Sequence, residues 1–312
     1  MTSAPPIVTL TLNPALDLST ATERVVPEHK LRCSAGRTDA GGGGINVSRV
    51  IGRLGGRTLA VYAMGGPTGE ALRRLVDAER MPGLAIPIEG PTRQNVTVDE
   101  SSTGKQFRFV LPGAPMTEAE WSACLDAAAS AVVEGGYLVA SGSLAPGIPT
   151  DVYARLARSM REQGVRLVVD ASGPALAAAL DEGVHLVKPS GRELGELVGR
   201  ELPDREAKVR AAQELVVRGS AQIVALTLGG DGAVLVTAEG VVEQSVPPVE
   251  VRSTVGAGDS FLAAMVLRMA QGRPLLEAFR AGVAAGTATA MSEGTGLCTR
   301  ADVERLERQL AG

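Results

Sequence analysis

The chain has 312 residues, of which 45% are hydrophobic, and its formal net charge is −4 with a pI near 5.5. This length is enough for one large core, alone or with a small appendage. The charge gives no basic field, so nucleic acid is not an expected partner and any phosphate must be bound by local sites. There is no apolar run of about 18 residues, and "MTSAPPIVTL" lacks the features of a signal peptide. We therefore expect a cytoplasmic protein with no membrane partner.

The cysteine and histidine content excludes some kinds of site. Cys33, Cys124 and Cys298 are far apart and form no CxxC pair, which favours a reducing compartment and argues against a zinc site. His29 and His185 are the two histidines, so we do not expect a histidine-based triad or metal cluster.

Short apolar runs alternate with stretches at helical spacing along most of the chain. The runs at 7–12, 58–64, 137–142, 165–170, 184–189 and 222–228 are typical of buried strands. Residues 150–163, 174–182 and 204–218 have the spacing of helices. This alternation predicts an α/β fold, with a mostly parallel central sheet flanked by helices on both faces.

Two insertions, at about 13–40 and 92–112, depart from this alternation. The second contains "RQNVTVDESSTGKQFRFVL", in which two alternating runs flank a Ser-Ser-Thr-Gly turn typical of a hairpin. We expect these insertions to form a small antiparallel β lid on a single domain of residues 1–312. Such a half-exposed sheet could serve as a lid or as a dimer surface.

In the stretch "STVGAGDSF" (253–261), three residues with little or no side chain, Gly-Ala-Gly, directly precede an aspartate. An apolar helix is predicted over 261–272, so Gly-Ala-Gly lies at its N-terminus. Unpaired N–H groups and the helix dipole favour an anion there. Asp259 stands in the first turn. Both a plain N-terminal aspartate and a base that takes a proton from an attacking hydroxyl fit this position.

The stretch "DAGGGGINVSRVIGRLGG" (39–56) places four glycines before a predicted helix. A flexible linker is possible, but the immediate helical periodicity favours a backbone surface for a ligand. The motif is neither a Walker A loop nor a GxGxxG turn directly after the first strand. Other candidates are Asp17 after the first strand, Arg93 at the base of the lid, and Lys188 at a strand end, together with the glycine-rich turn within 226–236.

Together these motifs resemble the ribokinase-like (pfkB) family of carbohydrate kinases, from Thr9 to about Thr299. The glycine run 41–56 is similar to the family's first signature, and "STVGAGDSF" is similar to the second. The segments "KLRC" (30–33), "TRQN" (92–95), "SGSLAPG" (141–147) and "GTGLC" (294–298) resemble the phosphosugar kinases of the family.

The resemblance implies a role for each matching residue. Asp259 would be the base, and Gly256, Ala257 and Gly258 would form the anion hole. The residues that would hold the sugar phosphate are Asp17, Lys30, Gly42, Gly43, Asn46, Arg93 and Ser143. ATP would meet Lys188, Ser190, Arg192, Thr227, Gly229, Gly230, Gly232 and Ser292, and Glu193 would meet Mg²⁺ through water.

The implied activity is that of a 6-phosphofructokinase, which phosphorylates the C1 hydroxyl of fructose 6-phosphate with ATP and Mg²⁺. K⁺ is a further possible cofactor, and a homodimer through the lid is implied. Ser190 and Ser292 stand where the family commonly has asparagine. A 1-phosphofructokinase and a tagatose-6-phosphate kinase remain alternatives, with "TLNP" (11–14) favouring the first. Outside the enzymes of this class, a non-catalytic sugar-phosphate sensor is possible, whereas a dinucleotide-binding oxidoreductase is disfavoured by the missing GxGxxG turn.

Overall fold

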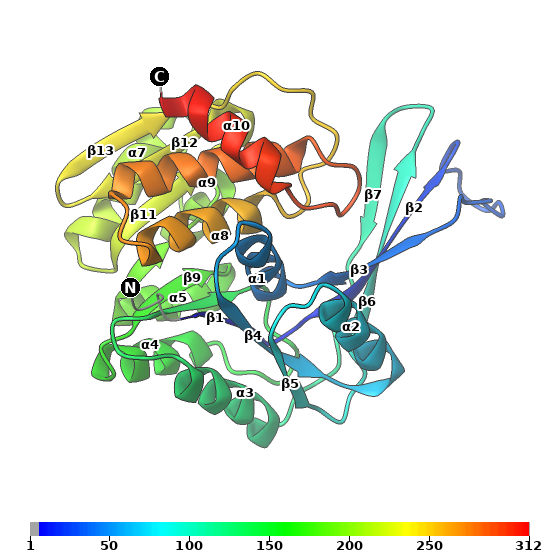
Figure 1. Cartoon of the computed structure of the whole chain (residues 1–312), viewed down its shortest axis with the longest axis horizontal. Coiled ribbons are helices and arrows are strands. Elements are labelled where there is room, and N and C mark those ends of the chain that lie inside the picture. Colours follow the sequence, from blue (N-terminus) through cyan, green and yellow to red (C-terminus); the bar gives the residue numbers. More distant parts are fainter. Residues whose placement is uncertain (1–5, 312) are drawn as a thin grey trace.

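The computed structural model describes residues 6–311, so the first five residues of the stretch tested for a signal peptide lie outside it. Within that range a nine-stranded sheet has the order β13-β12-β11-β10-β9-β8-β1-β4-β5 (Figure 1). Its strands are β1 (Ile7–Thr11), β4 (Thr58–Met64), β5 (Gly83–Pro87), β8 (Tyr137–Ser141), β9 (Arg166–Asp170), β10 (Val184–Val187), β11 (Ala221–Thr227), β12 (Ala233–Thr237) and β13 (Gly240–Gln244). All neighbours pair in parallel except β11–β12 and β12–β13. The predicted mostly parallel sheet is confirmed.

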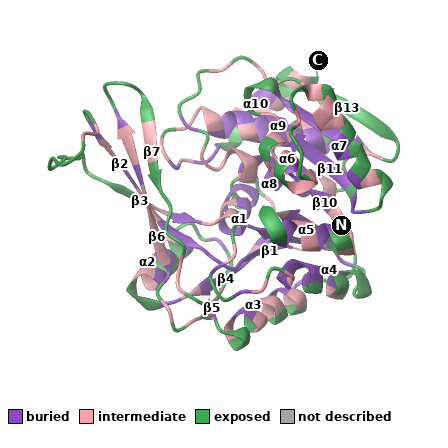
Figure 2. Ribbon diagram, turned by 180° about the vertical axis from the view of Figure 1, so that it is seen from behind, coloured by how far each residue is buried: buried purple, intermediate pink, exposed green. Residues whose placement is uncertain are grey.

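Helices cover both faces of this sheet, as predicted. One core lies beneath α3 (Glu118–Ala131), α4 (Val152–Glu162), α5 (Gly173–Glu182), α6 (Gly191–Val198) and α7 (Arg205–Val217). The other lies beneath α1 (Gly43–Arg53), α8 (Ala257–Ala270), α9 (Leu275–Ala290) and α10 (Arg300–Ala311). The strands between these layers are mostly buried, as Figure 2 shows. No helix among residues 6–311 is long and apolar enough to cross a bilayer.

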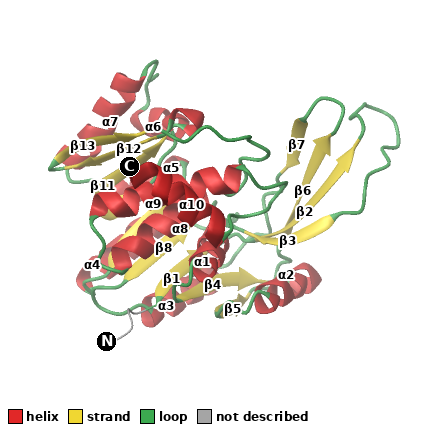
Figure 3. Ribbon diagram, turned by 45° about the horizontal axis from the view of Figure 1, so that its top comes forward, coloured by secondary structure: helices red, strands yellow, loops and turns green. Residues whose placement is uncertain are grey.

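A second sheet of four strands projects from the main body (Figures 1 and 3). Its strands are β2 (Ala15–Thr22), β3 (Arg37–Gly41), β6 (Arg93–Glu100) and β7 (Lys105–Phe109), in the order β3-β2-β6-β7. The predicted hairpin is present as the antiparallel pair β6–β7, and β2–β3 is also antiparallel. The central pair β2–β6 runs parallel. Helix α2 (Gly66–Ala78) packs against the base of this sheet.

The connection after β1 fixes where a ligand can enter the main sheet. The chain passes from β1 to β4 on one side, and it later returns to add β8 on the other side of β1. Two connections therefore leave the carboxyl ends of β1 and β8 in opposite directions. In open α/β sheets, such a switch point opens a crevice in which ligands bind.

Candidate active site

Helix α8 begins at the Gly-Ala-Gly stretch, earlier than the predicted start at Phe261. Its N-cap is Gly256, whose φ of 74° is a left-handed conformation that favours glycine. In the first backbone hydrogen bond of the helix, the Ser260 N–H donates to the Gly256 carbonyl at 2.9 Å. The N–H groups of Gly258 and Asp259 precede that bond and have no partner in the helix. The Ala257 N–H, one of the expected anion-hole donors, instead donates to the Thr254 carbonyl at 3.3 Å. The free donors of the first turn are therefore Gly258, which was expected, and Asp259, which was not.

Asp259, in the first turn of α8, is held by a side chain from α1. The amide Nδ2 of Asn46 donates to Oδ2 of Asp259 at 2.9 Å. Burial, with a smaller contribution from the nearby Asp170 carboxylate, raises the pKa of Asp259 from 3.8 to about 6. A carboxylate with this pKa is mostly ionised at neutral pH and remains basic enough to accept a proton.

Lys188 lies directly against the first turn of α8. It follows β10, is buried, and forms an ion pair of 3.2 Å between its Nζ and Oδ1 of Asp170. Burial alone would lower the pKa of Lys188, but the carboxylates of Asp170 and Asp259 outweigh it and raise that pKa. A β-carbon added to Gly258 would lie 3.1 Å from Nζ. The missing side chain at 258 therefore lets the lysine approach the helix N-terminus.

A polar cavity of about 260 Å³ lies on one side of Asp259. Its lining consists of Gly43, Ser141, Gly142, Ser143, Asp170, Ala171, Ser172, Glu193 and Asp259. The glycine run is a packed element here rather than a linker, because an added β-carbon at Gly43 would fall on the Ser141 side chain. Gly42 is the N-cap of α1 with a φ of 117°. The glycines thus allow α1 to start directly against the end of β8.

Arg93 extends this polar region at the base of the second sheet. Its two terminal nitrogens donate to the carbonyls of Leu111 and Asn13, at 2.8 and 3.0 Å, and one of them contacts Oγ of Ser143 at 3.4 Å. Its buried Nε has no acceptor among residues 6–311. A buried donor without a partner is costly and calls for an explanation, such as a ligand.

Asp17 faces the same region from β2. Asn95 of β6 donates to its carboxylate at 2.8 Å, and burial raises its pKa despite that bond and the charge of Arg93. The parallel pairing of β2 with β6 sets Asp17 directly beside Asn95. The second sheet therefore contributes a desolvated carboxylate and guanidinium to one site.

A more apolar cavity of about 330 Å³ lies on the other side of the first turn of α8. Its polar edge is formed by Ser190, Thr227 and the turn of Gly229, Gly230 and Gly232. Its wall is formed by Val246, Val249, Val251, Val283 and Phe261, and its inner end by Ala257 and Gly258. A flat aromatic base with a phosphate tail suits such a site, because the apolar wall is continuous with the free N–H groups.

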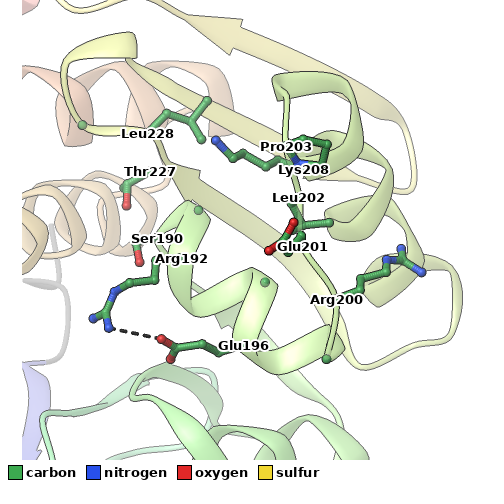
Figure 4. A pocket seen from close by; sticks show the side chains of 14 residues that line it. Ser190, Arg192, Glu196, Arg200, Glu201, Leu202, Pro203, Lys208, Thr227 and Leu228 are labelled. Carbon is green, nitrogen blue, oxygen red and sulfur yellow. Dashed lines mark hydrogen bonds and ion pairs between the residues drawn. The ribbon is translucent and has the colours of Figure 1, made fainter.

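Ser190 and Glu193 form a reciprocal cap at the start of α6. The Ser190 Oγ accepts from the Glu193 N–H at 3.2 Å, and the Glu193 carboxylate accepts from the Ser190 N–H at 2.8 Å. Arg192, which we expected to meet the nucleotide, instead pairs with Glu196 at 3.1 Å. As Figure 4 shows, it lines a cavity of about 880 Å³ between α6 and Lys208, which adjoins the apolar cavity and shares Ser190, Thr227 and Gly229 with it.

Two expected residues, Lys30 and Ser292, do not lie with the others. Lys30 is exposed in the long connection between β2 and β3, at the far end of the second sheet. Ser292 lines a fourth cavity with Arg49, Arg53 and Glu293, and it is absent from the lining of the apolar cavity. The chain turns after α9 ends at Ala290, which carries Ser292 away from that cavity.

Sequence reasoning did not single out Asp170, Asn95 or Asn13. Asp170 ends the predicted strand 165–170, and an acid at the carboxyl end of a parallel strand is a usable signal. Asn95 lies within the quoted "TRQN" motif, but its partner Asp17 depends on strand pairing. Asn13 donates from Nδ2 to the Pro112 carbonyl and to Ser143 Oγ, at 3.0 and 3.2 Å, joining segments far apart in sequence.

Most of the chain matches a known protein family. Residues 10–302 match the model of the pfkB family carbohydrate kinases. The chain belongs to the pfkB family. It is accordingly a sugar kinase, a phosphotransferase with a ribokinase-like fold, as the resemblance implied.

Named pfkB relatives align with nearly the whole chain. It is 44% identical to the ATP-dependent 6-phosphofructokinase isozyme 2 of Escherichia coli, covering 98% of this chain and 99% of the relative. It is 34% identical to a 1-phosphofructokinase of Bacillus subtilis, over 93% and 94% of the two chains. The crystal structure of phosphofructokinase-2 from Escherichia coli in complex with potassium has a TM-score of 0.95 and 43% identity, covering 99% of this chain and 100% of that one.

Proposed function

We propose that this pfkB kinase is an ATP-dependent 6-phosphofructokinase that phosphorylates the C1 hydroxyl of fructose 6-phosphate. One observation carries the proposal. The consecutive residues Gly258 and Asp259 line two different cavities, the apolar one and the polar one. A nucleotide in the first and a sugar in the second would meet at the N-terminus of α8. The similarity to the Escherichia coli 6-phosphofructokinase supports the same substrate pair.

The sugar phosphate is assigned to Arg93 and Ser143. A guanidinium is always charged and forms directed bonds to phosphate oxygens, and Arg93 has an unused buried Nε. Ser143 connects this arginine to the polar cavity that contains Asp259. Asp17, already oriented by Asn95, is placed to accept hydrogen bonds from sugar hydroxyls. These contacts would leave the C1 end of the sugar facing Asp259.

The transfer itself uses Asp259 as the general base. Its carboxylate accepts the proton of the C1 hydroxyl as that oxygen attacks the γ-phosphorus of ATP, and the bond between that phosphorus and the oxygen shared with the β-phosphate breaks. The N–H groups of Gly258 and Asp259 donate to the transferred group. Lys188, buried and charged, offsets the negative charge that the nucleotide brings.

ATP is assigned to the apolar cavity, with its phosphates along the turn from Thr227 to Gly232 and near Ser190. Mg²⁺ is expected to enter as part of the nucleotide substrate, and the carboxylates of Asp170 and Glu193 in the polar cavity are the hard oxygen donors it prefers. Bound there, Mg²⁺ would neutralise phosphate charge. The named potassium complex of the Escherichia coli relative makes K⁺ a further candidate cofactor.

The second sheet is proposed to act as a lid and as a homodimer surface. It contributes Asp17 and Arg93 to the site and projects from the main body. The exposed apolar side chains of Phe109, Val110 and Leu111 lie at its β7 edge, and exposed apolar patches mark contact surfaces. We expect a cytoplasmic homodimer, which sedimentation would report as a change to monomer in Phe109→Lys.

One assay tests the proposed function. The purified chain is given ATP and Mg²⁺ with fructose 6-phosphate, fructose 1-phosphate, tagatose 6-phosphate or free fructose, and ADP release is measured. The highest kcat/KM is expected with fructose 6-phosphate. A preference for fructose 1-phosphate would instead favour the 1-phosphofructokinase activity of the Bacillus subtilis relative. No turnover with any of the sugars would leave a non-catalytic sensor as the better account.

A further inference from the structure

A buried arginine on α1 lies behind the hydrogen bond between Asn46 and Asp259. Arg49 follows Asn46 by three residues, which places both side chains on one face of the helix. Its Nη1 donates to Oδ1 of Asn46 at 3.4 Å, and the Asn46 Nδ2 donates to Asp259 at 2.9 Å. The asparagine amide thus lies between a cation and a carboxylate.

These two neighbours determine which way the amide faces. A flipped amide would place its oxygen against the Asp259 carboxylate and its NH₂ group against the guanidinium, giving two repulsive contacts. In the observed orientation both contacts are favourable. Oδ2 of Asp259 is occupied by Asn46, whereas no hydrogen bond from residues 6–311 reaches Oδ1. Because Asp259 lines the polar cavity, this second oxygen is left free to take a proton from a substrate there.

Arg49 is itself tightly held, so it can act as a fixed support. Its side chain is 5% exposed. Its Nε and Nη2 bond to Oε1 of Glu79 at 2.8 and 2.5 Å, and its Nη1 donates to the Ala40 carbonyl at 2.9 Å. Asp39 on β3 lies 3.7 Å away. The guanidinium therefore joins the second sheet, the end of α2 and α1.

We propose that Arg49 is a positioning residue of the kinase, which orients the Asn46 amide so that it holds Asp259 in the geometry needed to accept the sugar proton. This inference rests on the proposed role of Asp259 as the base. Arg49 touches neither cavity wall that contains Gly258 or Asp259, so it would act through Asn46 rather than on a substrate.

The orientation of the Asn46 amide affects how kcat depends on pH. The groups whose charge or hydrogen bond acts on Asp259 are Asp170, Lys188 and Asp17, together with the Asn46 amide. The Asn46 bond favours the ionised form and lowers the pKa of Asp259 against the effect of burial. An Asn46 amide that is free to turn loses part of that bond, so the acidic limb of kcat moves to higher pH.

The experiment compares Arg49→Met with a matched control, Arg53→Met. Arg53 is one turn further along α1 and also pairs with Glu79, at 3.5 Å, but within residues 6–311 it forms no hydrogen bond or ion pair with Asn46 or Asp259. For each variant, kcat and both KM values are measured from pH 5 to 9, with thermal melts. Arg49→Met should lose about tenfold in kcat, the loss expected for weakening one hydrogen bond to a charged group. Its acidic limb should move up by about 0.5–1 pH unit, with KM for both substrates nearly unchanged. Arg53→Met should keep the wild-type kcat and the wild-type position of the acidic limb in its pH profile.

A conservative variant keeps the test decisive if Arg49→Met does not fold. Arg49→Lys can still pair with Glu79, but one ammonium group cannot also hold Asn46 and the Ala40 carbonyl, so the same drop and limb shift are expected at a near wild-type Tm. A lowered Tm with wild-type kcat and limb in Arg49→Met or Arg49→Lys would make Arg49 structural and overturn the proposal. Equal effects in Arg53→Met would also overturn it. A wild-type kcat in Asp259→Asn would instead show that Asp259 is not the general base. That result would contradict the proposed function itself rather than the role of Arg49.

Discussion

Lys188 and Asp170 form a buried ion pair, with Nζ and Oδ1 3.2 Å apart, beneath the N-terminus of α8. Asp170 ends β9 and Lys188 directly follows the neighbouring parallel strand β10, so the sheet itself sets their separation. Each charge is desolvated, and neither would be stable there alone. The pair thus keeps a cation at the place where the phosphates of a nucleotide are expected.

Lys188→Met should therefore destabilise the fold. It leaves the Asp170 carboxylate buried without its partner, which typically lowers the free energy of unfolding by about 3–5 kcal/mol. The double variant Lys188→Met/Asp170→Asn removes both charges and should recover most of that loss. Urea denaturation of the wild type, the single variant and the double variant gives the three free energies of unfolding to compare. A single variant as stable as the double would show that the ion pair does not matter for folding.

The raised pKa of Asp259 predicts opposite effects of pH on activity and stability. As a base, Asp259 must be ionised, so kcat should fall as pH drops below about 6. Its folded pKa lies above the ordinary 3.8, so its contribution to stability is present at low pH and is lost as pH rises from about 4 through 6. Asp259→Asn should then be more stable than the wild type at pH 8, by at most about 3 kcal/mol. Melts at pH 8 and pH 4 check this, and the difference should shrink at pH 4.

Gly258→Val should reduce kcat by about 10²-fold or more, because losing one oxyanion-hole donor typically costs about 2.7–4 kcal/mol. The added β-carbon would lie 3.1 Å from Nζ of Lys188, and the branched side chain would cover the N–H groups of the first turn. Ser260→Ala is the neighbouring control. Its buried Oγ accepts from Thr289 at 2.7 Å, so this variant should lose about 1 kcal/mol of stability and keep its kcat. A folded Gly258→Val enzyme with normal kcat would place the anion hole elsewhere.

Arg93→Ala should raise KM for fructose 6-phosphate by about ten- to a hundredfold, because it removes a charge-assisted hydrogen bond. KM for ATP should change little, since Arg93 does not line the apolar cavity. Arg93→Lys keeps the charge but loses the planar fork, and it should give an intermediate KM. Steady-state kinetics with fructose 6-phosphate and free fructose make the test. An equal loss with both sugars would show that Arg93 does not recognise the phosphate.

Much of this architecture can be predicted from the sequence because its signals are local. Apolar runs such as 165–170 correspond to buried parallel strands, and β9 occupies Arg166–Asp170. The Ser-Ser-Thr-Gly turn joins β6 to β7 as the alternating pattern indicates. The glycines before Asp259 indicate the start of a helix. The structure gives each glycine a different reason: Gly256 adopts the left-handed conformation of the N-cap, and Gly258 leaves space for Lys188.

The residues that sequence reasoning missed or misplaced depend on contacts between distant segments. The outer pairs of the second sheet are antiparallel, as expected, but Asn95 meets Asp17 because the central pair, β2 and β6, runs parallel. Arg192 and Ser292 are close in sequence to residues of the apolar cavity. Arg192 pairs with Glu196 and lines the adjoining cavity, whereas Ser292 lies beyond the end of α9 and lines a different one. Such outcomes are set by tertiary geometry, which one sequence does not contain.

The most direct test of the mechanism is kcat of Asp259→Asn with saturating ATP and fructose 6-phosphate. Asparagine has nearly the same shape and can still accept the Asn46 hydrogen bond, but it cannot take a proton. A drop of about 10²–10⁴-fold is expected, the usual contribution of a general base, with a Tm no lower than that of the wild type at pH 8. A folded variant with wild-type kcat would contradict the account, because the proton of the sugar hydroxyl would then be leaving by another route.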